Sequence, residues 1–371
     1  ENPNLVDVPK KYIKFFLKRM NLIENFVVDK NTIKLVEKEK YQNLDNNELT
    51  IAGNSFNLLL KKQINFDDRT AGFFVKDLNN SKMKFNIFLQ NGLIINNNST
   101  KEIYLPQDIF LNKNGGVKAV FEIEKKKFAY TSNKKLNCFY ASIYEIEKKK
   151  VRLKTKCLPD ENNVDFNGLG GAIVVKKNYV YLSIGAPEWD SKKIRDLAQN
   201  KDYLYGKIIR INKKDLLSDN SKLIKPEIFT FGHKNPQGLI IENENFFSVE
   251  HGPQGGDEIN LIKKNKNYGW PLVSYGTEYN DGKSFKKNDN IYQKPLFSFL
   301  PSIAPSSMDT CPNNLKKYYK DDICFMFLTL RDMSLYVVLV DKAKLNIISL
   351  EKFNIEQRLR HFGKINNKLY E

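Results

Sequence analysis

The residues best suited to chemistry gather in one segment, residues 231–270. It opens with GHKNPQG at residues 232–238, a donor-rich turn that suits an anionic or carbonyl-rich ligand. A Gly-rich loop bounded by acids follows at residues 250–258, and Ca²⁺ prefers such sets of roughly six to eight oxygens. A tight aromatic turn at residues 267–271 would close the site. Glycine, asparagine and proline mark turns anyway, but turns alone do not need these donors and acids together. We therefore predict a ligand-binding and cation-binding edge.

Short strands must position this segment, and an internal repeat indicates their arrangement. Four alternating apolar runs lead into Lys-rich turns and align on Ile143, Ile208, Ile259 and Val337, at intervals of 65, 51 and 78 residues. Each run follows another apolar strand. A multi-stranded unit of this size is typical of a propeller blade. We predict an all-β fold, a six-bladed β-propeller of four-stranded antiparallel blades.

The repeat is not evident near the start of the chain. We expect residues 1–80 to form an extra N-terminal segment and residues 81–371 to form the propeller. Helical periodicity is scarce, and it predicts one amphipathic helix at residues 10–25 and a short helix from Ser191 to Asn200.

The net charge of +17 invites a nucleic-acid interpretation, but the residue types argue against it. Only eight of the 60 basic residues are arginine, and the lysines are spread along the chain. Base readout favours arginine, and single-strand binding favours aromatic residues beside a basic groove. We expect a solvated Lys-rich surface and no nucleic-acid partner. No run of 18 apolar residues occurs, so no membrane span is predicted.

The four cysteines allow two interpretations. They form two pairs of sequence neighbours, Cys138 with Cys157 and Cys311 with Cys324, and each pair could close a hairpin as a disulfide in an exported protein. In a reducing compartment they would instead be four buried thiols. No CxxC pair is present and the chain has only three histidines, so a zinc site is not predicted.

A long motif resembles that of a known family. GHKNPQGL at residues 232–239, EHGPQGGDEINLI at 250–262 and KNYGWPLVSYG at 266–276 resemble the signature of the glucose/sorbosone dehydrogenases, the soluble PQQ-dependent sugar dehydrogenases. The resemblance covers residues 165–371 well and residues 84–165 weakly. It implies a six-bladed propeller in the periplasm or secreted, which oxidises an aldose or polyol with pyrroloquinoline quinone (PQQ) and Ca²⁺. The oligomeric state is not predicted.

The resemblance also implies roles for individual residues. Calcium would take the backbone carbonyls of Gly252, Pro253 and Tyr268 and the carboxylate of Glu258, and Glu278 could add another oxygen. The cofactor carboxylates would meet a set of polar and basic residues: Lys234, Asn235, Arg331, Arg358 and Arg360. Lysine and arginine are exchanged at two of these positions relative to the family, which keeps the charge but changes the geometry, since only arginine offers a planar fork.

The proton acceptor is where the chain departs from the family. The family's base histidine falls on Gly168, which has no side chain, so Asp165 or His361 would have to take the proton. Leu300 stands where some members have an aromatic residue that stacks on the cofactor. Two functions therefore stay open. One is a PQQ-dependent sugar dehydrogenase, and the other is a catalytically degenerate propeller that binds a glycan, an anion or a protein.

Overall fold

The computed structural model describes residues 48–61, 70–78, 82–96, 99–102, 105–159, 164–187, 191–220, 222–286, 290–365 and 368–370. The chain divides into two units, residues 1–50 and residues 51–371, and the second contains the five four-stranded sheets described below. The helix predicted at residues 10–25 lies outside the described residues.

Five antiparallel sheets of four strands each make up the propeller. The first contains β3 (Thr70–Leu78), β4 (Lys82–Leu89), β5 (Leu93–Asn96) and β6 (Ser99–Glu102). The second contains β7 (Val117–Ile123), β8 (Lys126–Lys135), β9 (Cys138–Glu145) and β10 (Lys150–Lys154). The third contains β11 (Gly170–Lys176), β12 (Tyr179–Ile184), β13 (Lys207–Asn212) and β14 (Glu227–Phe231). The fourth contains β15 (Asn235–Glu242), β16 (Asn245–His251), β17 (Asp257–Ile262) and β18 (Phe297–Phe299). The fifth contains β19 (Pro305–Thr310), β20 (Asp322–Thr329), β21 (Ser334–Asp341) and β22 (Ile347–Asn354).

The predicted propeller is confirmed, but the predicted count of six four-stranded blades is wrong. The described residues form five such sheets and two smaller ones, β1 (Glu48–Ala52) with β2 (Asn57–Lys61) and β23 (Gly363–Ile365) with β24 (Lys368–Tyr370). Blade size and chain length suggested six. The count fails because these end segments pair only as short two-stranded sheets.

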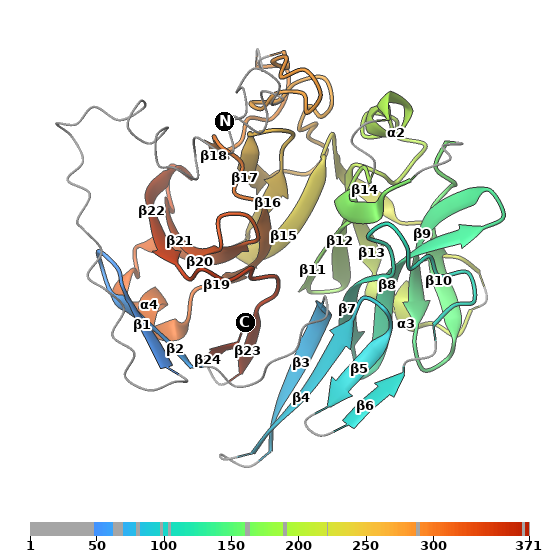
Figure 1. The fold of residues 1–371 in the computed structure, drawn as a ribbon, viewed down its shortest axis with the longest axis horizontal. Coiled ribbons are helices and arrows are strands. Elements are labelled where there is room, and N and C mark those ends of the chain that lie inside the picture. Colours follow the sequence, from blue (N-terminus) through green and yellow to red (C-terminus); the bar gives the residue numbers. More distant parts are fainter. Residues whose placement is uncertain are drawn as a thin grey trace, which may run out of the picture. The chain divides into compact units, whose positions relative to one another are not determined.

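The first strand of each four-stranded sheet is the inner one. β3 packs against β7, β7 against β11, β11 against β15 and β15 against β19, while β23 packs against β3 (Figure 1). Each sheet is a meander in which consecutive strands pair. The four repeats found in the sequence are the third strands β9, β13, β17 and β21, and the runs before them are the second strands β8, β12, β16 and β20.

Hydrophobic side chains fill the space between neighbouring sheets. The second and third sheets share a core that contains the fully buried Phe128, Tyr130, Phe166 and Tyr205. The fourth and fifth sheets share another, in which the ring centroids of Phe327 and Tyr336 lie 4.9 Å apart in a stacked pair. Burying aromatic side chains of this size contributes roughly 1.5–3 kcal/mol each. These cores hold the inner strands in a fixed arrangement.

Helices are few and short among the described residues: η2 (Phe166–Gly168), α2 (Lys192–Asp196), α3 (Lys213–Leu217) and α4 (Asn313–Tyr318). The short helix predicted from Ser191 to Asn200 is confirmed in part, because α2 ends at Asp196 and turns follow it; the Ser191 side chain caps α2 by accepting from Ile194 N. The buried Lys207 fixes the chain after α2, because its Nζ donates to the carbonyls of Leu197, Ala198 and Tyr205 at 2.7, 2.9 and 2.7 Å.

Both predicted disulfides are present. Cys138 at the start of β9 bonds to Cys157 beyond β10, and Cys311 beyond β19 bonds to Cys324 in β20. The alternative of four free thiols does not hold. Within the described part of the chain, no helix is both long and apolar enough to cross a membrane.

We expect Lys207→Met to lower the free energy of unfolding by about 3 kcal/mol, because the buried Tyr205 carbonyl would lose its donor and the carbonyls of Leu197 and Ala198 would each keep only a backbone donor. Urea denaturation followed by tryptophan fluorescence measures this change. Lys225→Met is the matched control, since Lys225 is exposed in the connection between β13 and β14 of the same sheet. Equal unfolding midpoints for the two variants would refute the role given to Lys207.

Candidate functional site

A buried carboxylate, Asp257, joins two loops at one end of the fourth sheet. Its Oδ1 accepts a hydrogen bond from Gly252 N at 2.8 Å. Its Oδ2 accepts from Ile303 N and Ala304 N, both at 2.7 Å. Hydrogen bonds to an ionised carboxylate are short and strong. Asp257 therefore fixes the Gly-rich loop between β16 and β17 against the loop that leads into β19.

The Gly-rich loop contains two weakly bonded carbonyls, on the buried Gly252 and Pro253. Gly255 and Gly256 adopt positive φ values of 83° and 69°, which turn the backbone back on itself. Pro253 O accepts from Ser302 Oγ at 3.2 Å, and Gly252 O accepts from the Tyr279 hydroxyl at 3.4 Å. Such long bonds leave both carbonyl oxygens with capacity for a cation or another donor.

An acidic face lies on the same sheet. Glu250 on β16 pairs in register with Glu258 on β17, and Glu258 pairs with Ser298 on β18, so the three side chains share one face. Asn260 Nδ2 donates to Glu258 Oε2 at 3.0 Å. Burial and then the charges of Glu250 and Asp257 raise the pKa of Glu258 well above its usual range. Among the described residues, the buried Asn260 Oδ1 and Ser298 Oγ have no hydrogen-bond partner.

A buried histidine closes this face. His233 Nδ1 lies 2.7 Å from Glu250 Oε2, and Nε2 lies 2.9 Å from Thr230 Oγ1. The imidazole stacks on the ring of Tyr268 with centroids 4.4 Å apart. The Tyr268 hydroxyl donates to Leu261 O at 2.7 Å. These contacts use both nitrogens of His233, so this residue holds Glu250 and Tyr268 in place.

Lys234 is buried but lacks a hydrogen-bond acceptor among the described residues. Lys234 is only 8% exposed, and its Nζ lies 5.7 Å from the ring centroids of both Trp270 and Tyr279. Burial lowers the pKa of Lys234 to about 8, although the nearby charges of Asp257 and Glu250 oppose that shift. An isolated buried ammonium is costly, so a ligand that supplies an acceptor would fit here.

Two further predicted residues are committed to protein contacts. Both carboxylate oxygens of Glu278 accept from Arg195 Nη1 at 2.9 Å, so the carboxylate offered for calcium is paired with an arginine. The side chain of Asn235 accepts from Gly170 N at 3.0 Å and from Gln237 Nε2 at 2.7 Å. Asn235 thereby ties the inner strands β11 and β15 together.

The three predicted arginines lie outside the strands. Arg331 and Arg358 are exposed, and Arg360 is half-buried. The loop that carries Arg331 contacts the loop tied to Asp257, because Arg331 N donates to Ile303 O at 3.1 Å. The sequence-based set of cofactor residues thus divides into the buried Lys234 and Asn235 and three peripheral cations.

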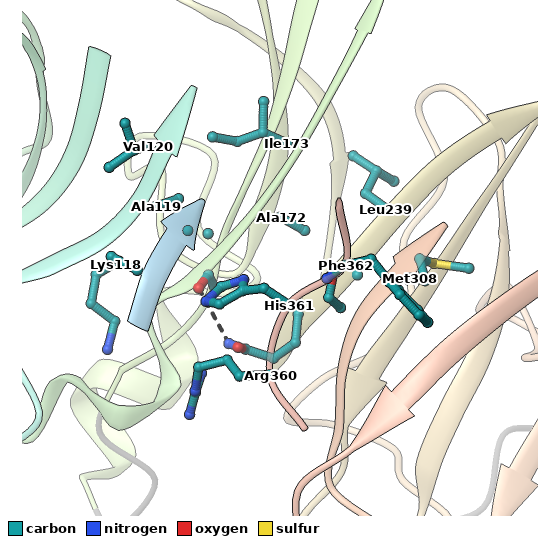
Figure 2. Close-up of a pocket in the computed structure, with 17 residues that line it drawn as sticks. Lys118, Ala119, Val120, Ala172, Ile173, Leu239, Met308, Arg360, His361 and Phe362 are labelled. Carbon is teal, nitrogen blue, oxygen red and sulfur yellow. Dashed lines mark hydrogen bonds between the residues drawn. The ribbon is translucent and has the colours of Figure 1, made fainter. Parts of the chain in front are cut away.

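The inner strands enclose a cavity of about 190 Å³. Glycines of β11 and β15 line this space together with Lys118, Arg360 and His361 (Figure 2). In Figure 2 Arg360, His361 and Phe362 enter from the C-terminal segment, opposite Ala119 and Val120 of β7. The basic lining suits an anion, and it places His361 within the propeller.

The region of the predicted proton acceptor is closely packed. A Cβ on Gly168 would lie 3.0 Å from Ala186 O and 3.1 Å from Pro187 O, so a side chain there would require the neighbouring loop to move. Asp165 caps η2: its carboxylate accepts from Asn114 Nδ2 at 3.0 and 3.1 Å and from Asn167 N at 2.8 Å. Leu300 is 67% exposed at the rim.

Sequence reasoning missed several residues of this site. Asp257 was noted only as an acidic boundary, although its three backbone donors make it the link between loops. Asn260 and Ser298 had no signal beyond strand alternation. Arg195 contacts Glu278 across 83 positions in the chain, a pairing that no local pattern shows. No group of three or more His, Cys, Asp or Glu arranged to hold a metal occurs in the described ranges.

Comparison with known proteins identifies relatives. The model of the family described as Glucose / Sorbosone dehydrogenase matches residues 97–367. The chain is 35% identical over 153 residues to "Aldose sugar dehydrogenase YliI" of Escherichia coli, which is 38% of this chain and 40% of that protein. The matched part therefore spans well under half the length of that relative.

Two solved structures share the fold. The apo form of a soluble aldose sugar dehydrogenase from Escherichia coli matches with a TM-score of 0.58 and 22% identity, over 72% of this chain and 82% of that one. The PQQ-bound aldose sugar dehydrogenase from Streptomyces coelicolor matches with a TM-score of 0.52 and 18% identity, over 79% and 90%. At these identities the likeness establishes the propeller fold alone.

We expect Asp257→Asn to lower the free energy of unfolding by about 3 kcal/mol, because an amide NH₂ would face backbone N–H groups that now share a charged acceptor. Chemical denaturation measures the loss. Hydrogen exchange should accelerate at residues 252 and 303–304 first. Asp281→Asn, in an exposed turn, serves as the control. Unchanged exchange in the two loops would contradict the account.

Proposed function

The chain belongs to the glucose/sorbosone dehydrogenase family, and from that membership we propose that it oxidises a sugar or polyol with PQQ as electron acceptor and Ca²⁺ as bound cation. The observation that carries this proposal is Lys234, a buried ammonium beside the Gly-rich loop without an acceptor of its own among the described residues. A quinone bearing several carboxylates would supply acceptors there. Arg331, Arg358 and Arg360 would add positive charge around it.

The acidic face supports a cation. Glu258 lies next to the buried Glu250, and the oxygens of Asn260 and Ser298 on the same sheet have no partner in the described part of the structure. A Ca²⁺ ion would relieve the repulsion between the carboxylates and satisfy those oxygens, since calcium accepts carboxylate, amide and carbonyl oxygens in loose geometry. We propose Glu258 and the backbone carbonyls of Gly252, Pro253 and Tyr268 as the ligands of this one cation.

When bound, PQQ accepts the two electrons released by the alcohol. The chain's own residues would do the rest. Lys234 and the arginines would orient the anionic cofactor, and the loop held by Asp257 would present its carbonyls from a fixed position. Trp270 and Tyr279 would exclude water around Lys234. Asp165 and His361 stay candidates for the proton acceptor.

Export to the periplasm or secretion is part of the proposal. Two disulfides fit an oxidising compartment, in which such bonds form and persist. A second function, binding of a glycan or an anion without turnover, is favoured by one observation. The segment around Gly168 packs too closely on Ala186 and Pro187 for an added side chain without movement.

We expect the purified protein, supplied with PQQ and Ca²⁺, to bind the quinone and to show the absorbance change of cofactor reduction when aldoses are added. Titration of PQQ at micromolar concentrations tests binding, and a panel of sugars tests turnover. Failure to bind PQQ would exclude the dehydrogenase. Binding of PQQ without reduction by any sugar would select the binding function.

We expect Ca²⁺ to raise the melting temperature of the wild type and not that of Glu258→Gln. At 100 times the dissociation constant, calcium should stabilise the fold by about 2.7 kcal/mol, measured by differential scanning calorimetry with chelator and then with added calcium. Without calcium the variant should melt no lower than the wild type, because the substitution removes a buried like-charge contact.

Glu122→Gln, at an exposed position on β7, is the matched control for that comparison. It should keep the full calcium shift. An equal calcium shift in Glu258→Gln would exclude Glu258 as a ligand.

A further inference from the structure

Lys234 and Gly168 flank one short segment of chain after β12. Ala186 N donates to Lys234 O at 2.8 Å, and Gly185 N donates to Leu169 O at 3.0 Å. A Cβ on Gly168 would touch Ala186 O, and a Cβ on Gly185 would lie 2.9 Å from Lys234 O. The backbone of Lys234 therefore lies close to Gly168, and Gly168 has no side chain that could accept a proton.

The surroundings of the Lys234 amine favour a neutral state more than those of an exposed lysine. Its Nζ faces the rings of Trp270 and Tyr279, and no acceptor among the described residues holds it as an ammonium. Asp257 and Glu250 act on it from β17 and β16 and favour the charged form, while Arg195 from α2 opposes it and is itself neutralised by Glu278. Burial is the largest effect and lowers the pKa of Lys234 to about 8.

We propose that Lys234 is the proton acceptor of the sugar oxidation, a catalytic residue that works from beside Gly168. The inference rests on the proposed function. Arginine could not serve in this way, because its guanidinium keeps its proton at any physiological pH, whereas a buried lysine releases one readily. Lysine at position 234 thus combines a positive charge that binds the cofactor with an amine that can act as a base.

The step balances. The neutral Lys234 amine takes the proton of the reacting hydroxyl and becomes an ammonium. The hydrogen on the adjacent carbon would leave with its bonding pair, and the carbon–oxygen single bond would become a carbonyl. The sugar would thereby lose two electrons, for which PQQ would be the acceptor when bound. Lys234 then returns its proton to solvent. With a pKa near 8, about a quarter of the molecules hold the neutral amine at pH 7.5.

The two other candidate proton acceptors are Asp165, whose carboxylate is bonded to other residues, and His361, which lies in the central cavity. The carboxylate of Asp165 accepts hydrogen bonds from the Asn114 side chain and from Asn167 N, and the second of these caps η2. His361 lies in the lining of the central cavity, with Arg360 beside it (Figure 2). Of the remaining histidines, His233 is held by Glu250 and Thr230, and His251 Nε2 donates to Pro305 O at 2.7 Å.

The first test needs no cofactor. A pH titration of the protein labelled with ¹³C at the lysine ε-carbon reports each amine, and the Lys234 signal is assigned by its loss in Lys234→Arg. We expect a midpoint near pH 8 for Lys234 and an ordinary midpoint, about 10.4, for the exposed Lys225. A midpoint for Lys234 at or above 10 would overturn the proposal, whether or not the protein is an enzyme.

The second test uses the protein loaded with PQQ and Ca²⁺. The single-turnover rate of cofactor reduction by an aldose should rise with pH and level off above the pKa of Lys234 in the loaded wild type. Lys234→Arg keeps the charge and should retain PQQ binding, but it should reduce the cofactor roughly 10²- to 10⁴-fold more slowly and lose this pH midpoint. Lys225→Arg should match the wild type.

The pH midpoint of the single-turnover rate should be the same in Asp165→Asn, His361→Asn and the wild type, even if the rates themselves differ. Retention of rate and midpoint in Lys234→Arg, or loss of the midpoint in Asp165→Asn or His361→Asn, would assign the proton elsewhere. Melting temperatures establish that each variant folds. If Lys234→Arg does not fold, Lys234→Met is used in its place. A wild type that fails to bind PQQ disproves the proposed function instead, and the cofactor-free titration still decides the state of the amine.

Discussion

The carboxylate of Asp257 is the contact on which the site depends. One oxygen holds Gly252 N and the other holds the backbone of residues 303 and 304, so a single buried charge fixes the loops of two neighbouring sheets. This contact fixes the carbonyls of the loop after β16. It also holds the loop that leads to β19, where Ile303 O accepts from Arg331 N. Without Asp257, Lys234 would also lose the charge that most favours its ammonium form.

Charge is divided across this end of the molecule. Glu250 and Glu258 occupy one face of the fourth sheet, while Lys234, Arg331, Arg358 and Arg360 lie on the loops and the cavity lining around it. Burying groups of one sign close together costs free energy unless partners offset it. The propeller cores supply the stability that offsets this cost. The buried oxygens of Asn260 and Ser298 have no partner among the described residues, which is where a cation would fit.

The sequence predicted the parts that local pattern controls. The four aligned runs are the third strands of four sheets, because a strand buried on both faces must be apolar throughout and its turn must be polar. Both cysteine pairs close as the hairpins suggested. The number of four-stranded blades was not predictable, since it depends on how the chain ends pair. Nor was the Arg195–Glu278 ion pair, which forms between residues that only the fold brings together.

The central claim is that the edge formed by residues 231–270 binds an anionic quinone and a cation together. A crystal structure of the protein soaked with PQQ and Ca²⁺, with anomalous scattering used to locate the cation, tests it most directly. We predict PQQ with an acceptor atom in hydrogen-bonding contact with Lys234 Nζ, and Ca²⁺ ligated by Glu258 or by the carbonyls of Gly252 and Pro253. Density for both ligands elsewhere, or for neither at saturating concentration, would contradict the account.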